Sequence, residues 1–283
     1  MKSLKYIAFL LLSIIFISCS SDDHTSTPDP TDETIGLVKI QEIANENHTI
    51  EIYSKNGSLI QGYNLITIRL KDKKNNEYLK DAQISWLPVM HMNMMEHSCP
   101  KSEVHKVEGK QTLYTGDIIF QMAQNETEYW DLTFTYMVNK ISYTAKDIIK
   151  VPASAKKTVS TFTGSDNVRY IIAYIAPENP KVALNDMSIG VYKMQDMMNF
   201  PVVNNYKIKI DPRMPSMGNH GSPNNTDLAQ SETGGFYKGK LSFTMSGYWK
   251  INMQLLNSSA QVLKGEPVTT EIPSSSLYFE IEF

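Results

Sequence analysis

A segment from Met90 to Pro100 concentrates donor atoms that bind soft metal ions. Its sequence, MHMNMMEHSCP, holds four methionines, two histidines and one cysteine. Thioether sulfur and imidazole nitrogen suit a copper ion better than a hard cation such as calcium or magnesium. The sequence therefore predicts a copper site in this segment, with Cu(I) favoured over Cu(II).

A fainter copy of this segment lies later in the chain, where residues 213–223 read RMPSMGNHGSP. The pattern common to both is Met-x-x-His-x-x-Pro, formed by Met94, His97 and Pro100 and again by Met217, His220 and Pro223. Proline limits backbone hydrogen bonding and favours an extended or turned path. Each copy is therefore expected on a loop after a strand, where several side chains can surround one ion.

Alternation along an extended chain decides which donors of the first segment share a face. Methionines at positions 90, 92 and 94 point together, and the histidine between them points away. If the chain turns after position 94, the next imidazole and the thiol join that face. The predicted ligands are therefore Met92, Met94, His97 and Cys99, with His91 as an alternative. The second segment offers a thinner set, which is Met214, Met217 and His220.

Both segments also have an interpretation without metal. Methionine fills irregular gaps in apolar cores, so a methionine-rich loop can simply cap the end of a β-sandwich. Cys99 is either a ligand, given its place two residues after His97, or a small buried core residue. The stretch MQDMMNF, residues 194–200, has three methionines but no nearby histidine, and we assign it to packing.

The elements that must hold these segments are β-strands. Runs rich in β-branched and aromatic residues, such as YNLITIRLKD (63–72) and YWDLTFTYMV (129–138), are separated by turn residues. No segment shows a long helical period. We therefore predict an all-β protein with two tandem immunoglobulin-like antiparallel β-sandwich domains, at residues 35–152 and 158–283.

The two predicted domains match each other at an offset of 123 residues. Outside the methionine–histidine pattern, the pairs matched at this offset are Tyr114 and Tyr237, Gly116 and Gly239, and Phe120 and Phe243. Trp130 also matches Trp249, once four extra residues before the tryptophan of the first copy are allowed for. The strand just before the pattern fits better at an offset of 124, which indicates a one-residue difference between the copies. This agreement predicts a duplicated domain.

The amino-terminal residues resemble the export signal of a bacterial lipoprotein. Lys2 and Lys5 flank the start of a short apolar run, and the run FISC (16–19) resembles a lipobox. The resemblance implies a signal peptide at residues 1–18, lipidation of Cys19 and a disordered tether at residues 19–34. The protein is then anchored in the cell envelope, at the outer membrane, and faces either the periplasm or the surface. An uncleaved apolar anchor is the alternative.

Charge and motif content argue against two broad classes of function. The formal net charge is −3 and the basic residues are scattered, so we expect no nucleic-acid partner. The chain shows no Ser/His/Asp order, glycine-rich phosphate loop or paired-carboxylate signature that would indicate catalysis. We therefore expect a protein that is not an enzyme.

The second copy resembles a known family. The run MPSMGNHGSP, the Tyr237-x-Gly239 strand and the Gly247-x-Trp249 strand are similar to those of the YtkA-like domain, over residues 181–256. The first copy departs from that pattern, because it lacks the glycines around its histidine and inserts residues 124–128. The resemblance implies an immunoglobulin-like sandwich in an exported protein, similar in outline to small periplasmic copper-binding domains.

These observations together predict a lipid-anchored, extracytoplasmic metal-binding protein. It would bind, buffer or deliver copper through its Met/His loops, without catalysis, and exchange the ion with a copper-donor or copper-acceptor protein. Thioether ligands favour reduced copper. The alternative is a surface or periplasmic interaction module, whose methionine-rich loops form an apolar contact for another protein and bind no metal.

Overall fold

The computed structural model describes residues 33–283. The predicted signal peptide, the lipidation site at Cys19 and all but the last two residues of the predicted tether lie outside this range. Glu33 is docked on the folded body: its carboxylate accepts hydrogen bonds from the backbone N–H groups of Gln111 (2.6 Å) and Thr112 (2.9 Å) and from the Thr112 hydroxyl. None of the helices in the described range is long and apolar enough to cross a membrane.

The prediction of an all-β, antiparallel fold is confirmed. In the first unit, sheet A has the order β1 (Val38–Ala44), β2 (His48–Ser54), β3 (Gly62–Asp72), β7 (Leu113–Phe120) and β6 (His105–Lys106). Sheet B has the order β5 (Glu96–His97), β4 (Gln83–His91), β8 (Tyr129–Val138) and β9 (Ile141–Ile149). Alternate residues of β8, such as Trp130 and Phe134, turn inward and share one core with Ile52 and Ile68 of sheet A.

The second unit is a single antiparallel sheet, sheet C, folded around its own core. Its strands in order are β10 (Val159–Thr163), β11 (Arg169–Ala176), β12 (Leu184–Lys193), β16 (Tyr237–Ser242), β15 (Thr226–Gln230), β13 (Lys207–Met214), β17 (Tyr248–Leu256) and β18 (Val262–Lys264). Off this path, β14 (His220–Gly221) pairs with β13 and β19 (Tyr278–Glu282) pairs with β17, and the short 3-10 helix η2 (Pro215–Met217) joins β13 to β14. The sheet is continuous because β15 pairs with both β16 and β13.

Strand pairings of the first unit recur in the second. The order β1–β2–β3–β7–β6 corresponds to β10–β11–β12–β16–β15, and β5–β4–β8 corresponds to β14–β13–β17. Met90 pairs with His97 in the first unit, and Met214 pairs with His220 in the second. The one-residue difference between the copies therefore lies in the loop between these partners. The immunoglobulin-like assignment stays a prediction.

Matched aromatic residues make matching hydrogen bonds in the two units. The Tyr114 hydroxyl donates to the Lys80 carbonyl (2.7 Å), and the Tyr237 hydroxyl donates to the Val203 carbonyl (2.8 Å), which lies 123 residues further on. The buried indoles behave in the same way: Trp130 Nε1 donates to the Met122 carbonyl and Trp249 Nε1 to the Met245 carbonyl, both at 3.0 Å. These residues are therefore structural supports, not parts of a ligand site.

The tyrosine-x-glycine pattern has an equally structural cause. A Cβ atom on Gly116 would lie 2.9 Å from the carbonyl oxygen of Glu103, and one on Gly239 would lie 2.6 Å from that of Thr226. These distances are shorter than real Cβ contacts, so a side chain would push two strands apart. Glycine at both positions allows the backbones to approach closely.

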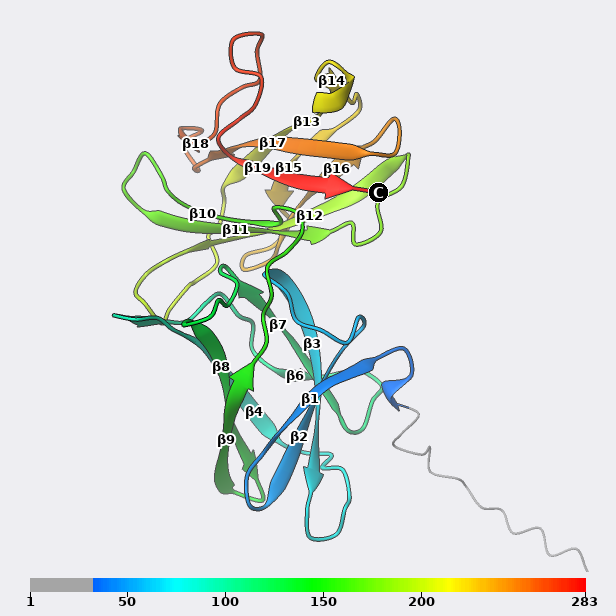
Figure 1. The fold of residues 1–283 in the computed structure, drawn as a ribbon, viewed down its shortest axis with the longest axis vertical. Helices are drawn as coiled ribbons and strands as arrows, with labels where there is room; N and C mark the ends of the chain where they lie inside the picture. Colours follow the sequence, from blue (N-terminus) through cyan, green and yellow to red (C-terminus); the bar gives the residue numbers. More distant parts are fainter. Residues whose placement is uncertain (1–32) are drawn as a thin grey trace, which may run out of the picture.

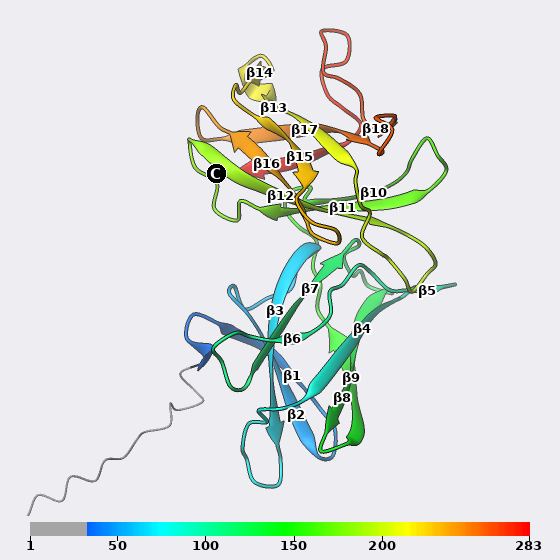
Figure 2. The same ribbon diagram turned by 180° about the vertical axis from the view of Figure 1, so that it is seen from behind.

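The two units are stacked end to end along the long axis of the molecule (Figure 1). An apolar cluster joins them, with Tyr63 and Ile119 from the first unit and Ile171, Tyr192 and Phe200 from the second. Figure 2 shows β5 at the junction of the units and β14 at the far end of the second unit. The two methionine–histidine loops thus lie at corresponding ends of their own units and do not face each other.

Candidate metal centre

The first methionine–histidine segment folds into a tight hairpin. β4 and β5 pair through Met90 with His97 and through His91 with Glu96. The tip is a four-residue turn that the Met92 N–H closes on the Met95 carbonyl at 3.0 Å. Because the chain reverses over residues 92–95, the simple alternation of an extended strand does not continue through the segment.

This turn separates the ligands that alternation along the strand grouped together. The Met94 side chain is 95% exposed and points to solvent, whereas Cys99 is 1% exposed in the core of the first unit. Burial raises the pKa of the Cys99 thiol well above its ordinary value, and the thiolate is the form that binds metals. The predicted four-ligand set therefore does not form, and only Met92 and His97 of that set line a common cavity.

His91, the alternative ligand, is engaged by charged partners on the outer face of sheet B. Its Nδ1 lies 2.7 Å from a Glu96 carboxylate oxygen, and its Nε2 contacts the buried carboxylate of Asp131. Asp131 also pairs with Lys146 at 2.7 Å. Both ring nitrogens are turned toward carboxylates on this outer face, so His91 does not join the other predicted donors.

A cavity of about 520 Å³ lies between the two units and is lined by five methionines and one histidine. From the first unit it is lined by Met92, Met95, His97, Gln121 and Met122, and from the second by Thr161, Arg169, Ile171, Met194, Met197 and Phe200. Residues 194–200, which the sequence assigned to packing, thus stand opposite the first methionine–histidine segment. The three methionines of residues 194–200 were the signal in the sequence that could have indicated a site. Only the docking of the two units shows that they lie opposite the first methionine–histidine segment.

His97 is held in the orientation that a metal ligand needs. The ring is 7% exposed, and its Nδ1 lies 2.7 Å from the Ser98 carbonyl. A carbonyl only accepts, so Nδ1 carries a proton, and in the neutral ring Nε2 is then the nitrogen with a lone pair. Gln121 Nε2, 3.2 Å from Nδ1 and 3.1 Å from the same carbonyl, donates to that carbonyl. Metal-binding histidines are commonly fixed in this way by a bond from the other nitrogen.

Nε2 of His97 has no hydrogen-bond partner within residues 33–283. It is also not among the fully buried, unpaired side-chain nitrogen and oxygen atoms of these residues, so it is accessible. Since His97 lines the cavity, this nitrogen is a donor that the first unit offers there, beside the side chain of Gln121. Its ring packs edge-to-face with Trp130, with the centroids 5.6 Å apart. The imidazole is therefore fixed by packing as well as by its hydrogen bond.

Charge at the cavity limits which ions could bind. Among the described residues that line it, none is acidic and Arg169 carries the only formal charge. Calcium and magnesium require oxygen ligands, usually carboxylates. No cluster of three or more His, Cys, Asp or Glu residues able to hold a metal is found in residues 33–283. The cavity therefore suits a soft ion of low charge held by sulfur and nitrogen.

Backbone hydrogen bonds fix the two walls against each other. The Ser98 N–H donates to the Met197 carbonyl across the unit boundary at 2.8 Å. On the second wall, the Met194 N–H donates to the Arg169 carbonyl at 2.8 Å, and the Asp196 carboxylate accepts the Met198 N–H at 2.8 Å. The loop of residues 194–200 is thus held from both sides.

The second methionine–histidine segment does not gather its donors. Met214 is 3% exposed in the core of the second unit, whereas Met217 is 56% exposed and His220 is also exposed. Met214 and His220 are cross-strand partners, yet one faces the core and the other faces solvent. This set of predicted ligands is not brought together around a cavity.

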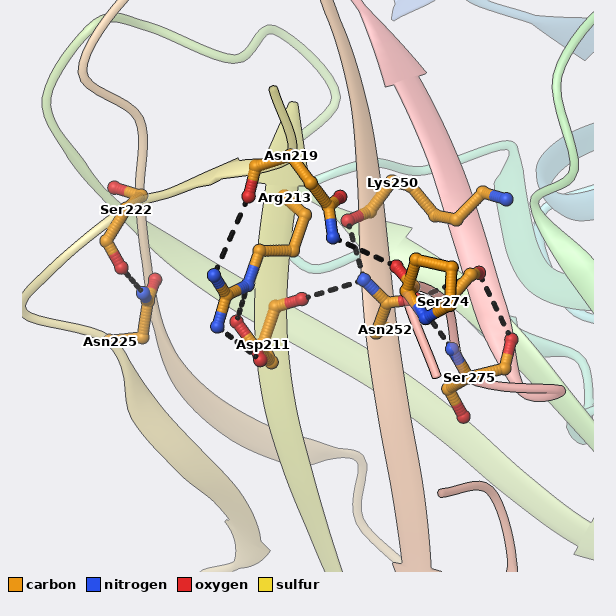
Figure 3. A network of polar contacts seen from close by, with 10 residues as sticks. Asp211, Arg213, Asn219, Ser222, Asn225, Lys250, Asn252, Ser274 and Ser275 are labelled. Carbon is orange, nitrogen blue, oxygen red and sulfur yellow. Dashed lines mark hydrogen bonds and ion pairs between the residues drawn. The ribbon is translucent and has the colours of Figure 1, made fainter. Parts of the chain in front are cut away.

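A network of polar side chains, and not a cluster of sulfur and imidazole donors, surrounds this second loop (Figure 3). Arg213 forms a two-pronged ion pair with Asp211, at 2.7 and 2.9 Å, and reaches the Asn219 carbonyl at 3.5 Å. The Asn219 side chain donates to the Pro273 carbonyl at 2.9 Å. Asn252 ties the neighbouring strand to the same region through the Asp211 carbonyl at 3.1 Å. The network explains the loop's shape without a bound ion.

Comparisons with known proteins add little to this geometry. The sequence matches no model of a known protein family and no curated protein. Among solved structures, a chain described as pT26-6p aligns with 86% of this chain and 64% of its own length, at 7% identity and a TM-score of 0.25. Similarity at that level does not establish a common fold. The resemblance to the YtkA-like domain stays a prediction.

Proposed function

We propose that this protein binds Cu(I) in the cavity between its two units. The ligands would be His97 Nε2 together with thioethers drawn from Met92, Met95 and Met122 of the first unit and Met194 and Met197 of the second. The observation that carries the proposal is the fixed imidazole of His97 facing a methionine-lined cavity that lacks any carboxylate. Thioether and imidazole donors suit Cu(I), and a singly charged ion tolerates the nearby Arg169 better than a divalent one.

The biological role follows from the chemistry of these ligands. Neutral thioethers release Cu(I) more readily than thiolates do, and the cavity lies next to solvent-exposed methionines. Such a site fits a protein that buffers copper or passes it to a copper-acceptor protein. The lipobox-like run ending at Cys19 supports a location in the cell envelope, with the lipid in the outer membrane.

A titration tests the proposal directly. The mature protein is titrated with Cu(I) under reducing conditions, in competition with a coloured Cu(I) chelator of known affinity. We expect about one equivalent to bind, as one cavity implies. Replacing His97→Ala should abolish competition, whereas His220→Ala should leave it unchanged. Failure of the wild-type protein to compete with a chelator of moderate affinity would refute copper binding.

The alternative of a protein-interaction module also has one observation in its favour. Met94, Met95 and Met198 expose apolar side chains near the junction of the units. If they form an interface, replacing each by serine should abolish binding of another envelope protein, whether or not copper is present. Loss of partner binding without any measurable affinity for Cu(I) would favour this alternative.

A further inference from the structure

Exposure of the sulfur donors falls stepwise from solvent into the cavity. Met94, at the tip of the β4–β5 hairpin, is 95% exposed; Met95 beside it is 49% exposed and yet lines the cavity. His97 and Met92 lie further in. The turn that Met92 and Met95 close keeps its ends within about 7 Å, so the four donors occupy one short path.

We propose that Met94 is the capture residue of this site: it takes Cu(I) from solvent or from a donor and passes it to Met95 and onward to His97. This inference rests on the proposed function. Transfer from Met94 to Met95 exchanges one copper–sulfur bond for another, the step to His97 exchanges a copper–sulfur bond for a copper–nitrogen bond, and the ion remains Cu(I). No electron or proton moves. Met94 is not a ligand of the final site, because its side chain is almost fully exposed and does not line the cavity.

Two features make the thioether of Met94 suited to this step. It makes no packing contact that would fix it, so it is free to turn between solvent and the cavity mouth. Met95 exposes half of its side chain at that mouth and can meet the ion there. A residue placed only for packing would be buried among apolar neighbours, as Met90 is in the core of the first unit.

The chain supplies a matched control. Met217 aligns with Met94 in the second unit, is 56% exposed and ends η2, which leads into β14 at the far end of the second unit (Figure 2). Replacing Met94→Leu removes the sulfur but keeps an apolar side chain of similar volume, and such a change is well tolerated at an exposed position. Met217→Leu makes the same change at a residue that does not line this cavity.

Stopped-flow mixing of the full mature protein with Cu(I) held by bathocuproine disulfonate measures the rate of copper transfer as the complex loses colour. We expect Met94→Leu to slow transfer at least about fivefold, or about 1 kcal/mol of barrier, with an unchanged equilibrium Kd. Met217→Leu should change neither quantity.

Three outcomes would overturn the inference. A Met94→Leu rate equal to wild type, with copper still bound, removes the capture role and leaves the proposed function standing. A Kd weakened in proportion to the rate makes Met94 a ligand of the final site. A wild-type protein that takes no copper from the chelator removes both proposals together.

Discussion

The two methionine–histidine loops occupy corresponding positions in the two units, but their surroundings differ. The loop of the first unit lies at the junction, where the second unit covers it and adds Met194 and Met197. The loop of the second unit lies at the free end, where a network around Arg213 shapes it and its exposed donors face water. The same short pattern therefore becomes a candidate site only where another part of the chain supplies the opposite wall.

A second pair of matched residues also differs in its surroundings, because one lies near the junction of the units and the other on the surface. Asp117 lies 123 residues before Lys240. Burial raises the pKa of Asp117 to about 6, and its charge acts on Tyr63 and Tyr192 at the junction. Lys240 is on the surface and pairs with Asp186 at 2.5 Å. Burial beside the junction thus shifts the titration of Asp117, whereas the matched position carries a surface ion pair.

The largest effect should come from the framework that the units have in common. Trp130→Ala and Trp249→Ala each remove a fully buried indole, and each should lower the free energy of unfolding by about 3–5 kcal/mol. Urea denaturation followed by circular dichroism measures both. Exposed Leu87→Ala serves as the control with little expected effect. A large cost in one unit only would mean that the two frameworks are not equivalent.

The next effect should separate the two histidines. His97→Ala should weaken Cu(I) binding by more than the roughly 10- to 100-fold that loss of a ligand's hydrogen-bond partner costs, because the fixed Nε2 donor itself is lost. His220→Ala should leave the affinity unchanged, since its ring is exposed at the far end. Chelator competition measures both affinities. Equal losses in the two variants would contradict the contrast between the loops.

Adjacent methionines of the second unit give a finer test. Met197 lines the cavity, whereas its neighbour Met198 does not and is exposed. At a copper concentration 100 times Kd, binding should stabilise the wild-type protein by about 2.7 kcal/mol, and a tenfold weaker site would reduce this to about 1.4 kcal/mol. We expect the smaller gain for Met197→Leu and the full gain for Met198→Leu, measured by thermal unfolding with and without Cu(I). If both variants keep the full gain, the second unit contributes no ligand.

The smallest effect concerns Asp117. Its pKa of about 6 means that the folded protein keeps a proton that the unfolded chain releases near pH 4. Stability should therefore fall as the pH rises from about 4 to about 6. Asp117→Asn should remove this loss and stabilise the protein by on the order of 1 kcal/mol at pH 7.5, with little change at pH 4. Lys240→Gln, at the uncovered position, should show no such dependence over this range. Urea unfolding at the two pH values measures it.

Several features of the fold could be predicted because they depend on local sequence. Alternation and turn residues indicate the strands, and the matched tyrosines and tryptophans reveal positions with the same hydrogen bonds. The better fit at an offset of 124 before the loop also reflects a real difference: Met90 and His97 are one residue further apart than Met214 and His220.

The composition of the candidate site could be predicted only in part. His97 and Met92 were among the expected ligands and do line the cavity. The turn at residues 92–95 leaves Met94 exposed, and Cys99, which comes after β5, is buried in the core. Alternation describes a straight strand and fails where the chain reverses. Met194 and Met197 were missed because their role depends on how two units dock, which no periodicity along the chain encodes.

The bond between the Ser98 N–H and the Met197 carbonyl has a practical consequence for engineering. It spans two parts of the chain that are joined covalently only through the segment near residues 152–158. Halves produced as separate polypeptides, divided in that segment, would each hold an incomplete set of sulfur and nitrogen donors. If the cavity binds Cu(I) as proposed, the ion would promote association of the two fragments, and their reassembly would report its presence.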